Sequence, residues 1–281
     1  MNSRLVNPYW MLEKARQTGK AIIQFNINNL EWARYILEVA NELNSNIILG
    51  VSESAVKYFG GYNTVYSCVN ALISDLNINV DVCLHLDHGS SFLSCKHAID
   101  SGFTSVMIDA SKFDIDKNTS ITKEVVEYAR TKKVFVEGEI GVLYTSDGIG
   151  NMTACEECIR YVKETLVDAV APSIGNKHGI YGDIPKLNLN LVKELKDNID
   201  SILVLHGGSG LKIGELKNCI KAGITKININ TDLQIAWSNA VRDYLKINKD
   251  IYDPRKIISS GEEAIKNVVR NKIKEINYIG N

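Results

Sequence analysis

Three of the five histidines in this chain are predicted to form a metal site. His88, His178 and His206 stand in the segments HLDHG, NKHG and LHGGSG, each at or just beyond the end of a short apolar run. Three imidazole nitrogens that leave a fourth position open for a substrate oxygen are the ligand set of a catalytic zinc ion. The alternative for each one alone is an ordinary hydrogen-bonded histidine. His85 is expected to support the site from below, and His97 to lie on a helix surface.

Acidic residues accompany these histidines. Asp87 directly precedes His88, where a carboxylate can act as a general acid and base or can support the neighbouring histidine by a hydrogen bond. Asp109 in MIDAS and Glu139 in VEGEIG follow two further apolar runs. For both, three interpretations stay open: support of the metal ligands, an alternative metal position, or hydrogen bonding at the rim of the site.

Two glycine- and asparagine-containing segments predict a phosphate site. HGGSG begins at His206, and NINT covers residues 228–231. Glycines let backbone N–H groups approach an anion, Ser209 and Thr231 add hydroxyl donors, and the N-terminus of a following helix contributes a favourable dipole. The alternative interpretation is a pair of tight turns between strands and helices.

The elements that must position these residues alternate between short apolar runs and amphipathic stretches, which is the pattern of βα units. Eight units in a row favour a (β/α)8 TIM barrel, with an open doubly wound sheet as the alternative. A barrel carries its active site at the carboxyl ends of its strands, which is where the polar residues above fall. Strands are predicted at 21–25, 47–51, 80–86, 105–108, 134–139, 169–172, 202–205 and 226–229. Helices are predicted at 30–43, 64–76, 92–101, 121–132, 189–197, 213–222 and 232–245, with extra helices at 9–17, capping the barrel floor, and at 260–276.

Length and composition fit this architecture. A chain of 281 residues with 45% hydrophobic and 23% charged residues fits one barrel domain over residues 1–281. The formal net charge of -1 gives no electrostatic case for a nucleic acid or membrane partner, so we expect a small-molecule partner. Six dispersed cysteines, and no apolar segment that reads as an export signal or a membrane span, predict a cytoplasmic protein.

A set of motifs spread over nearly the whole chain resembles the class II, metal-dependent ketose-bisphosphate aldolases, which act on fructose and tagatose bisphosphates. HLDHG, HGGSG and KININTD in that order are the specific part of the resemblance. The full set is QFNINN at 24, GVSESAVKYFGGY at 50, HLDHG at 85, SVMIDAS at 105, VEGEIG at 136, HGIYG at 178, LHGGSG at 205, KININTD at 226 and DPRK at 253.

The resemblance implies reversible cleavage of a ketose phosphate, such as fructose 1,6-bisphosphate, into dihydroxyacetone phosphate and an aldehyde. It implies Zn²⁺ on His88, His178 and His206, with a monovalent cation as a further cofactor, and Asp87 as the catalytic proton donor and acceptor. It also implies a homodimer or homotetramer, in which two arginines hold the second phosphate, one across a subunit boundary. The implied substrate-binding residues are Gly179, Gly207, Gly208, Ser209, Asn228, Asn230, Thr231, Arg242 and Arg255.

Two departures from the family pattern bear on the substrate. The segment after VEGEIG reads GVLYTSDGIGNMTACEE, shorter than the family's loop and without its GGxED pattern, so Asp147 is the candidate replacement for that glutamate. Gly182 stands where fructose-bisphosphate members commonly carry a lysine. A tagatose-bisphosphate aldolase, or a specialised aldolase with another aldehyde, therefore stays open. So do a non-catalytic phosphosugar-binding relative and a metal-dependent hydrolase.

The chain also contains a lysine and a pair of cysteines that could take part in other kinds of chemistry. A lysine that forms a Schiff base is the other route to aldol chemistry, and Lys177 is its candidate, because Lys226 begins its strand and is expected to face the opposite end of the barrel. Cys155 and Cys158 have CxxC spacing without a second cysteine pair. We expect them to pack in a helix rather than to bind zinc or exchange electrons.

Overall fold

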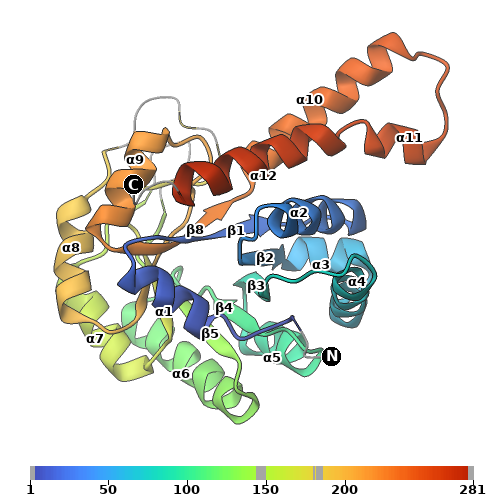
Figure 1. Ribbon diagram of the computed structural model, residues 1–281. Coiled ribbons are helices and arrows are strands. Elements are labelled where there is room, and N and C mark those ends of the chain that lie inside the picture. Colours follow the sequence, from blue (N-terminus) through green and yellow to red (C-terminus); the bar gives the residue numbers. More distant parts are fainter. Residues whose placement is uncertain (1–3, 144–149, 180, 182–185, 278–281) are drawn as a thin grey trace.

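Eight parallel strands close into a barrel in chain order, as predicted (Figure 1). The computed structural model describes residues 4–143, 150–179, 181 and 186–277. Closure from β1 to β8 excludes the open sheet, because β1 pairs with both β2 and β8. The strands are β1 (Ile22–Asn26), β2 (Ile47–Ser52), β3 (Val82–Gly89), β4 (Ser105–Ile108), β5 (Phe135–Ile140), β6 (Ala169–Pro172), β7 (Ile202–Leu205) and β8 (Ile224–Ile229).

Helices surround this barrel, and most of them match the predicted ranges to within a few residues. Two short helices, α3 and α11, were not predicted, because their six or seven residues are too few to show a helical period. The helices are α1 (Tyr9–Gln17), α2 (Leu30–Glu42), α3 (Glu53–Phe59), α4 (Tyr62–Asp75), α5 (Phe92–Asp100), α6 (Ile115–Lys132), α7 (Cys155–Thr165), α8 (Leu189–Asn198), α9 (Ile213–Ala222), α10 (Thr231–Ile247), α11 (Pro254–Ser259) and α12 (Glu262–Asn277).

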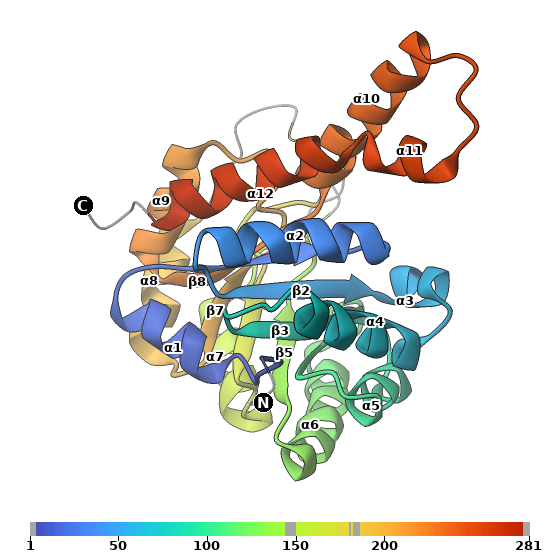
Figure 2. The same cartoon turned by 45° about the vertical axis from the view of Figure 1, so that its right-hand side comes forward.

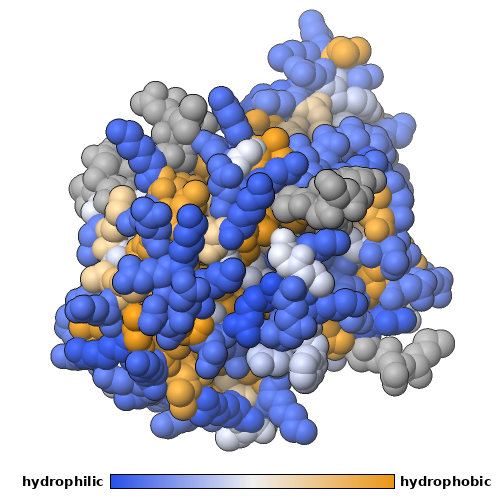
Figure 3. All heavy atoms as spheres, turned by 60° about the vertical axis from the view of Figure 1, so that its left-hand side comes forward, coloured by the Kyte–Doolittle hydropathy of each residue, from blue (hydrophilic) through white to orange (hydrophobic). Residues whose placement is uncertain are grey.

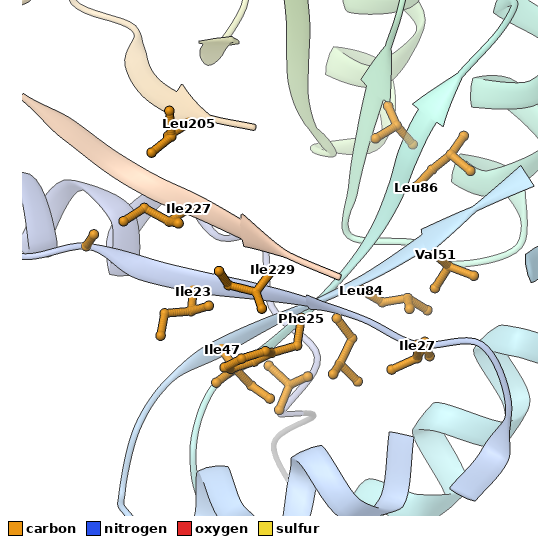
Figure 4. Packing of buried hydrophobic residues seen from close by; sticks show 14 of the residues in the cluster. Ile23, Phe25, Ile27, Ile47, Val51, Leu84, Leu86, Leu205, Ile227 and Ile229 are labelled. Carbon is orange, nitrogen blue, oxygen red and sulfur yellow. The ribbon is translucent and has the colours of Figure 1, made fainter. Parts of the chain in front are cut away.

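Apolar side chains form two buried layers on the two sides of the barrel wall. The larger layer lies between the strands and the helices, and Figure 4 shows its part around Phe25, Ile227 and Leu84. The smaller layer joins interior side chains such as Phe135 to Leu12 of α1. Helix α1 therefore closes the amino-terminal end of the barrel, as predicted for the helix at 9–17, and the polar interior positions lie nearer the other end.

Lys226 lies in this polar interior. It is 1% exposed, and its Nζ atom is 2.7 Å from Oε2 of Glu137. The expectation that Lys226 faces the opposite end of the barrel is wrong. Strand β8 begins two residues earlier than predicted, at Ile224, so Lys226 is its third residue and reaches the middle of the barrel.

The chain leaves the barrel near its C-terminus and forms a projecting arm. Helices α10 and α11 and the start of α12 extend away from the barrel in both views (Figures 1 and 2). Of the residues of α10, only Leu233 and Val241 are buried. Beyond them Ile247 is 83% exposed and Tyr252 is 91% exposed. The arm thus presents apolar side chains that this chain does not itself cover.

Hydrophilic residues predominate on the face shown in Figure 3. None of the described helices combines the length and the apolar character needed to cross a bilayer.

Candidate active site

The structure brings His88, His178 and His206 together at the carboxyl ends of the strands. His88 belongs to β3, His178 follows β6 and His206 follows β7. One ring nitrogen from each can be chosen so that all three lie within 4.8 Å of one another. His88 Nε2 is 3.1 Å from His206 Nδ1. Residues separated by up to 118 positions in sequence thus form one cluster of nitrogen donors.

Two carboxylates orient this cluster from behind. His88 Nδ1 is 2.9 Å from Asp109 Oδ2, and His206 Nε2 is 2.9 Å from Glu137 Oε1. Each carboxylate accepts a hydrogen bond from one ring nitrogen and leaves the other nitrogen of that ring facing the cluster. Ligands of a tetrahedral zinc ion at about 2.05 Å lie about 3.3 Å apart, close to the spacing of the His88 and His206 nitrogens. The donor set therefore fits zinc.

His88 reaches the cluster through an unusual backbone conformation. Its φ angle is +52°, in the left-handed region, and the pairing of β3 with β4 shifts register between Leu86 and Gly89. Adjacent strand residues normally face opposite sides, but this irregularity lets both Asp87 and His88 line the same pocket. A Cβ atom on Gly89 would lie 2.6 Å from the Met107 carbonyl oxygen, so the turn requires glycine. Strain of this kind is common at functional sites.

Asp87 is buried beside the histidines and is held by three amides. Gln24 Nε2 donates to Oδ1 at 2.9 Å, Asn26 Nδ2 donates to Oδ2 at 2.7 Å, and Asn228 Nδ2 donates to Oδ1 at 3.3 Å. Burial would raise the pKa of this carboxyl, but the charge on His88 outweighs it and holds the pKa well below its usual range. Asp87 is therefore an oriented carboxylate at the pocket floor.

Neither Gln24 nor Asn26 was among the predicted site residues, although both belong to the segment QFNINN that contributes to the family resemblance. A signal was present in the segment QFN, where polar residues alternate with an apolar one inside a strand that reads as buried. Alternation places Gln24 and Asn26 on the barrel interior while Phe25 packs outward against the helices.

A second buried polar group lies beneath the histidines. Lys226 donates to Glu137 Oε2 at 2.7 Å and to Asn228 Oδ1 at 3.0 Å. Burial would raise the pKa of Glu137, and the Lys226 charge instead holds it below its usual range. His85 Nδ1 is 2.7 Å from Ser105 Oγ, and burial together with the Lys226 charge lowers the pKa of His85 to about 3. His85 is thus neutral beneath the site.

Asp109 and Glu139 lie on the other side of His88. Glu139 Oε2 is 3.7 Å from His88 Nδ1 and has no hydrogen-bond partner in the described part of the chain. Burial and the charge of Asp109 raise the pKa of Glu139 to about 8. Burial opposes protonation of His88, but Asp87 and the hydrogen bond to Asp109 raise its pKa to about 10. His88, Asp109 and Glu139 also form a second set of atoms within metal-binding distance.

A pocket of about 290 Å³ opens above these groups. Ser209 Oγ accepts the N–H groups of Asn230 at 3.0 Å and Asp232 at 3.3 Å, and so ties the β7 loop to the N-terminus of α10. The Ser209 hydroxyl hydrogen stays available to a ligand. The pocket is lined by Asn26, Ser52, Asp87, His88, His178, Gly179, His206, Gly207, Ser209, Asn228, Asn230 and Thr231.

Three predicted substrate-binding residues do not line this pocket. The Gly208 N–H donates to the Asn228 carbonyl at 3.1 Å, and a Cβ atom there would lie 2.6 Å from Ile227 Cγ2, so Gly208 packs against β8. Arg242 lies on α10 and contacts Ser238. Arg255 lies on α11, where its side chain is 89% exposed. The structure places both arginines on the arm, outside the pocket of their own chain.

The remaining reactive groups do not enter the site. Lys177 lies over the ring of Tyr181, 5.4 Å from its centroid, and does not line the pocket. Cys155 and Cys158 are free thiols, and burial raises the pKa of Cys158 to about 12, which makes its thiol unreactive. Asp147 and Gly182 lie outside the described residues.

Comparison with known proteins gives one consistent family. The family model described as Fructose-bisphosphate aldolase class-II matches residues 6–281. A fructose-bisphosphate aldolase of Geobacillus stearothermophilus is 46% identical over 281 residues, which cover 98% of this chain and 98% of the relative. The fructose-bisphosphate aldolase of Staphylococcus aureus strain Mu50 is 47% identical over 277 residues, which cover 96% of each chain.

Solved structures agree with this result. The crystal structure of the YdjI aldolase from Escherichia coli K12 matches with a TM-score of 0.84 and 30% identity over 98% of both chains. A fructose-bisphosphate aldolase from Campylobacter jejuni matches with a TM-score of 0.83 over 96% of this chain and 94% of the other, and at 24% identity it shows the shared fold alone.

Proposed function

We propose that this chain, which belongs to the class II fructose-bisphosphate aldolase family, catalyses the reversible cleavage of fructose 1,6-bisphosphate into dihydroxyacetone phosphate and an aldehyde. The observation that carries this proposal is the cluster of three histidines beside the buried carboxylate of Asp87, in a pocket bordered by the N-terminus of α10. A metal ligand set, a proton-transfer group and a phosphate-binding end are the three parts that such an aldol cleavage needs.

We assign zinc binding to His88 Nε2, His206 Nδ1 and a ring nitrogen of His178. The chemistry that zinc supplies when bound there is polarisation of the substrate carbonyl and stabilisation of the negative charge that develops on its oxygen. Asp109 and Glu137 hold the rings of His88 and His206 in the orientation that turns these nitrogens toward the pocket. His178, which is exposed, stands at the pocket mouth.

Asp87 carries the proton transfer in this proposal. In the cleavage direction its carboxylate accepts the proton of the substrate hydroxyl, the adjacent carbon–carbon bond breaks, and the bonding electrons move toward the carbonyl. The carbon freed by this cleavage then takes a proton from a second acid, for which Asp147 is the candidate, to give dihydroxyacetone phosphate. In the condensation direction Asp87 returns the hydroxyl proton. The amides of Gln24, Asn26 and Asn228 fix the carboxylate in place without supplying a competing acid.

The phosphate of dihydroxyacetone phosphate is assigned to the opposite side of the pocket. Ser209 and Thr231 offer hydroxyl donors there, and the N-terminus of α10 borders the same space, where its dipole favours an anion. Gly179 and Gly207 line the pocket with positive φ angles of 87° and 66°, and glycine at both positions allows backbone N–H groups to approach an anion.

Removal of the metal tests the proposed activity. We expect the zinc-loaded protein to release dihydroxyacetone phosphate from fructose 1,6-bisphosphate, treatment with a chelator to abolish this release, and added Zn²⁺ to restore it. The measurement is a coupled assay for dihydroxyacetone phosphate. Tagatose 1,6-bisphosphate and a ketose 1-phosphate are run beside it to rank substrates. Bound zinc without turnover of any of them would instead indicate a non-catalytic phosphosugar-binding relative.

We further propose a homodimer joined through the arm, because the arm carries uncovered apolar residues and both predicted phosphate-binding arginines. In this dimer Arg255 of one subunit completes the pocket of the other. The change Arg255→Ala should raise KM for fructose 1,6-bisphosphate by about 10-fold or more, since a charge-assisted hydrogen bond contributes about 1.5–3 kcal/mol.

The control for this prediction is Arg160→Ala, which removes an exposed arginine paired with Asp116 and Glu164 on α6 and α7. Mixing the Arg255→Ala protein with a His88→Ala protein gives a sharper result. Each mixed dimer would hold one pocket with both His88 and a partner arginine, so activity at low substrate should exceed that of either protein alone. A monomer on sizing, or an unchanged KM, would contradict the proposal.

A further inference from the structure

We propose that Lys226 is a positioning residue that sets the direction of hydrogen bonding in two hydrogen-bond chains of the site. One chain ends at His206 and the other at Asp87. This inference rests on the proposed zinc-dependent function. It assigns a role to a buried lysine that touches neither the histidine cluster nor the pocket.

Lys226 is the only lysine among the buried residues of the described chain, and it contacts two acceptors. Its ammonium group donates to Glu137 Oε2 at 2.7 Å and to Asn228 Oδ1 at 3.0 Å. Glu137 is fully buried, and Asn228 lines the pocket. Because an ammonium group is a donor only, both of its partners must turn an oxygen toward it.

The first hydrogen-bond chain runs from Lys226 through Glu137 to His206. With Oε2 of Glu137 anchored on Lys226, Oε1 is left to face His206 Nε2 at 2.9 Å. A carboxylate is an acceptor only, and its contact is shorter than the 3.3 Å between the same Nε2 atom and Asn228 Nδ2, so the hydrogen of the ring lies on Nε2 and the lone pair lies on Nδ1. This is the nitrogen that faces His88 at 3.1 Å. Lys226 thereby holds Glu137 in the orientation that fixes the His206 tautomer with a metal-binding lone pair toward the cluster.

The second hydrogen-bond chain runs from Lys226 through Asn228 to Asp87. Since Oδ1 of Asn228 accepts from Lys226, its Nδ2 group turns to Asp87 Oδ1 at 3.3 Å. The opposite orientation of the amide would bring an oxygen against the carboxylate. Lys226 therefore orients two groups at once. The Glu137 carboxylate turns an acceptor toward His206, and the Asn228 amide turns a donor toward Asp87.

A merely structural role is the alternative, in which Lys226 only neutralises Glu137 inside the barrel. Replacing a buried ion pair by two neutral groups often leaves stability unchanged, whereas removing one partner is strongly destabilising. The variants Lys226→Met and Lys226→Met with Glu137→Gln separate the two roles. The single variant leaves a buried carboxylate unpaired. The double variant removes both charges, and its amide can present either a donor or an acceptor to His206 Nε2, so the tautomer is no longer fixed.

The test measures zinc affinity of the metal-free protein by competition with a chromophoric chelator, and the thermal midpoint of each variant. We expect the double variant to regain the thermal midpoint lost in the single variant, while its zinc dissociation constant stays at least about 10-fold above that of the unchanged protein. Nitrogen-15 NMR of histidine-labelled, metal-free protein should show hydrogen on His206 Nε2 in the unchanged protein and a mixture of tautomers in the double variant. The kcat of the zinc-saturated double variant should fall more than its KM rises.

The control is Ile202→Ala, which truncates a buried interior residue of β7 in the apolar layer. It should lower the thermal midpoint and leave zinc affinity unchanged. Recovery of zinc affinity together with stability in the double variant would overturn the inference and leave Lys226 a structural role. Failure of the proposed function looks different, because the unchanged protein would then bind zinc without cleaving any phosphorylated ketose.

Discussion

Replacing His88 by alanine should remove the bound zinc and lower the rate of fructose 1,6-bisphosphate cleavage by at least about 10³-fold. A single hydrogen-bond donor to a developing oxyanion contributes roughly 10²–10³ in kcat, and the loss of the metal removes the whole polarising charge. His88 has its Nε2 atom 3.1 Å from His206 Nδ1 and is one of the two ligands that a carboxylate orients.

The matched control is His97→Ala, which removes an exposed histidine on α5. Zinc content by elemental analysis, steady-state kinetics and a thermal midpoint are measured for both variants. Histidine and alanine both carry a Cβ atom at this left-handed position, so the change adds no backbone strain, and any fall in the midpoint reports the lost contact with Asp109. If His88→Ala retained one zinc per chain and substantial turnover, the assignment of the three-histidine site would be wrong.

Much of the architecture behind this prediction could be inferred from the sequence. The alternation of apolar runs and amphipathic stretches predicted a closed barrel, and three strands, at 105–108, 169–172 and 202–205, have the predicted bounds. Closure brings all carboxyl ends to one rim, so residues as far apart as His88 and His206 could be placed together without any knowledge of register. Gly89 and Gly207, which directly follow His88 and His206, indicated that a turn begins at each of these strand ends.

The polar layer beneath the rim could not be inferred in the same way. The contact between Lys226 and Glu137 joins β8 to β5, and such a contact across the barrel depends on strand starts and stagger that periodicity does not fix. An error of two residues at the start of β8 was enough to misplace Lys226. The contact of Gln24 on β1 with Asp87 on β3 could not be predicted for the same reason.

The position of the arm is a second feature that could not be predicted from the sequence. Arg242 and Arg255 carry the family pattern in the sequence, yet α10 leads away from the barrel and takes both side chains out of their own pocket (Figure 2). A helix that continues beyond the core has few buried residues to reveal where it ends or what it meets. Sequence periodicity describes which face of α10 is apolar, not whether another chain covers that face.

Replacing Asp87 by asparagine should lower kcat in both directions by about 10²–10⁴-fold, the usual contribution of a general acid and base. The side chain keeps its size but loses one proton-accepting oxygen, and its N–H₂ group meets either the donor of Asn26 or the donors of Gln24 and Asn228. Bound zinc should be retained, because the assigned ligands are the three histidines. KM should change less than kcat, since the phosphate-binding residues lie on the other side of the pocket.

Asp81→Asn is the matched control, because it makes the same change just before the opposite end of β3, where Asp81 pairs with Arg4. Cleavage of fructose 1,6-bisphosphate and condensation of dihydroxyacetone phosphate with an aldehyde are measured for both variants, together with zinc content. Equal loss in the two directions is expected from microscopic reversibility, because one group accepts the proton in cleavage and returns it in condensation. A loss of zinc parallel to the loss of kcat would instead show that Asp87 acts by holding the metal ligands, as its position next to His88 also permits.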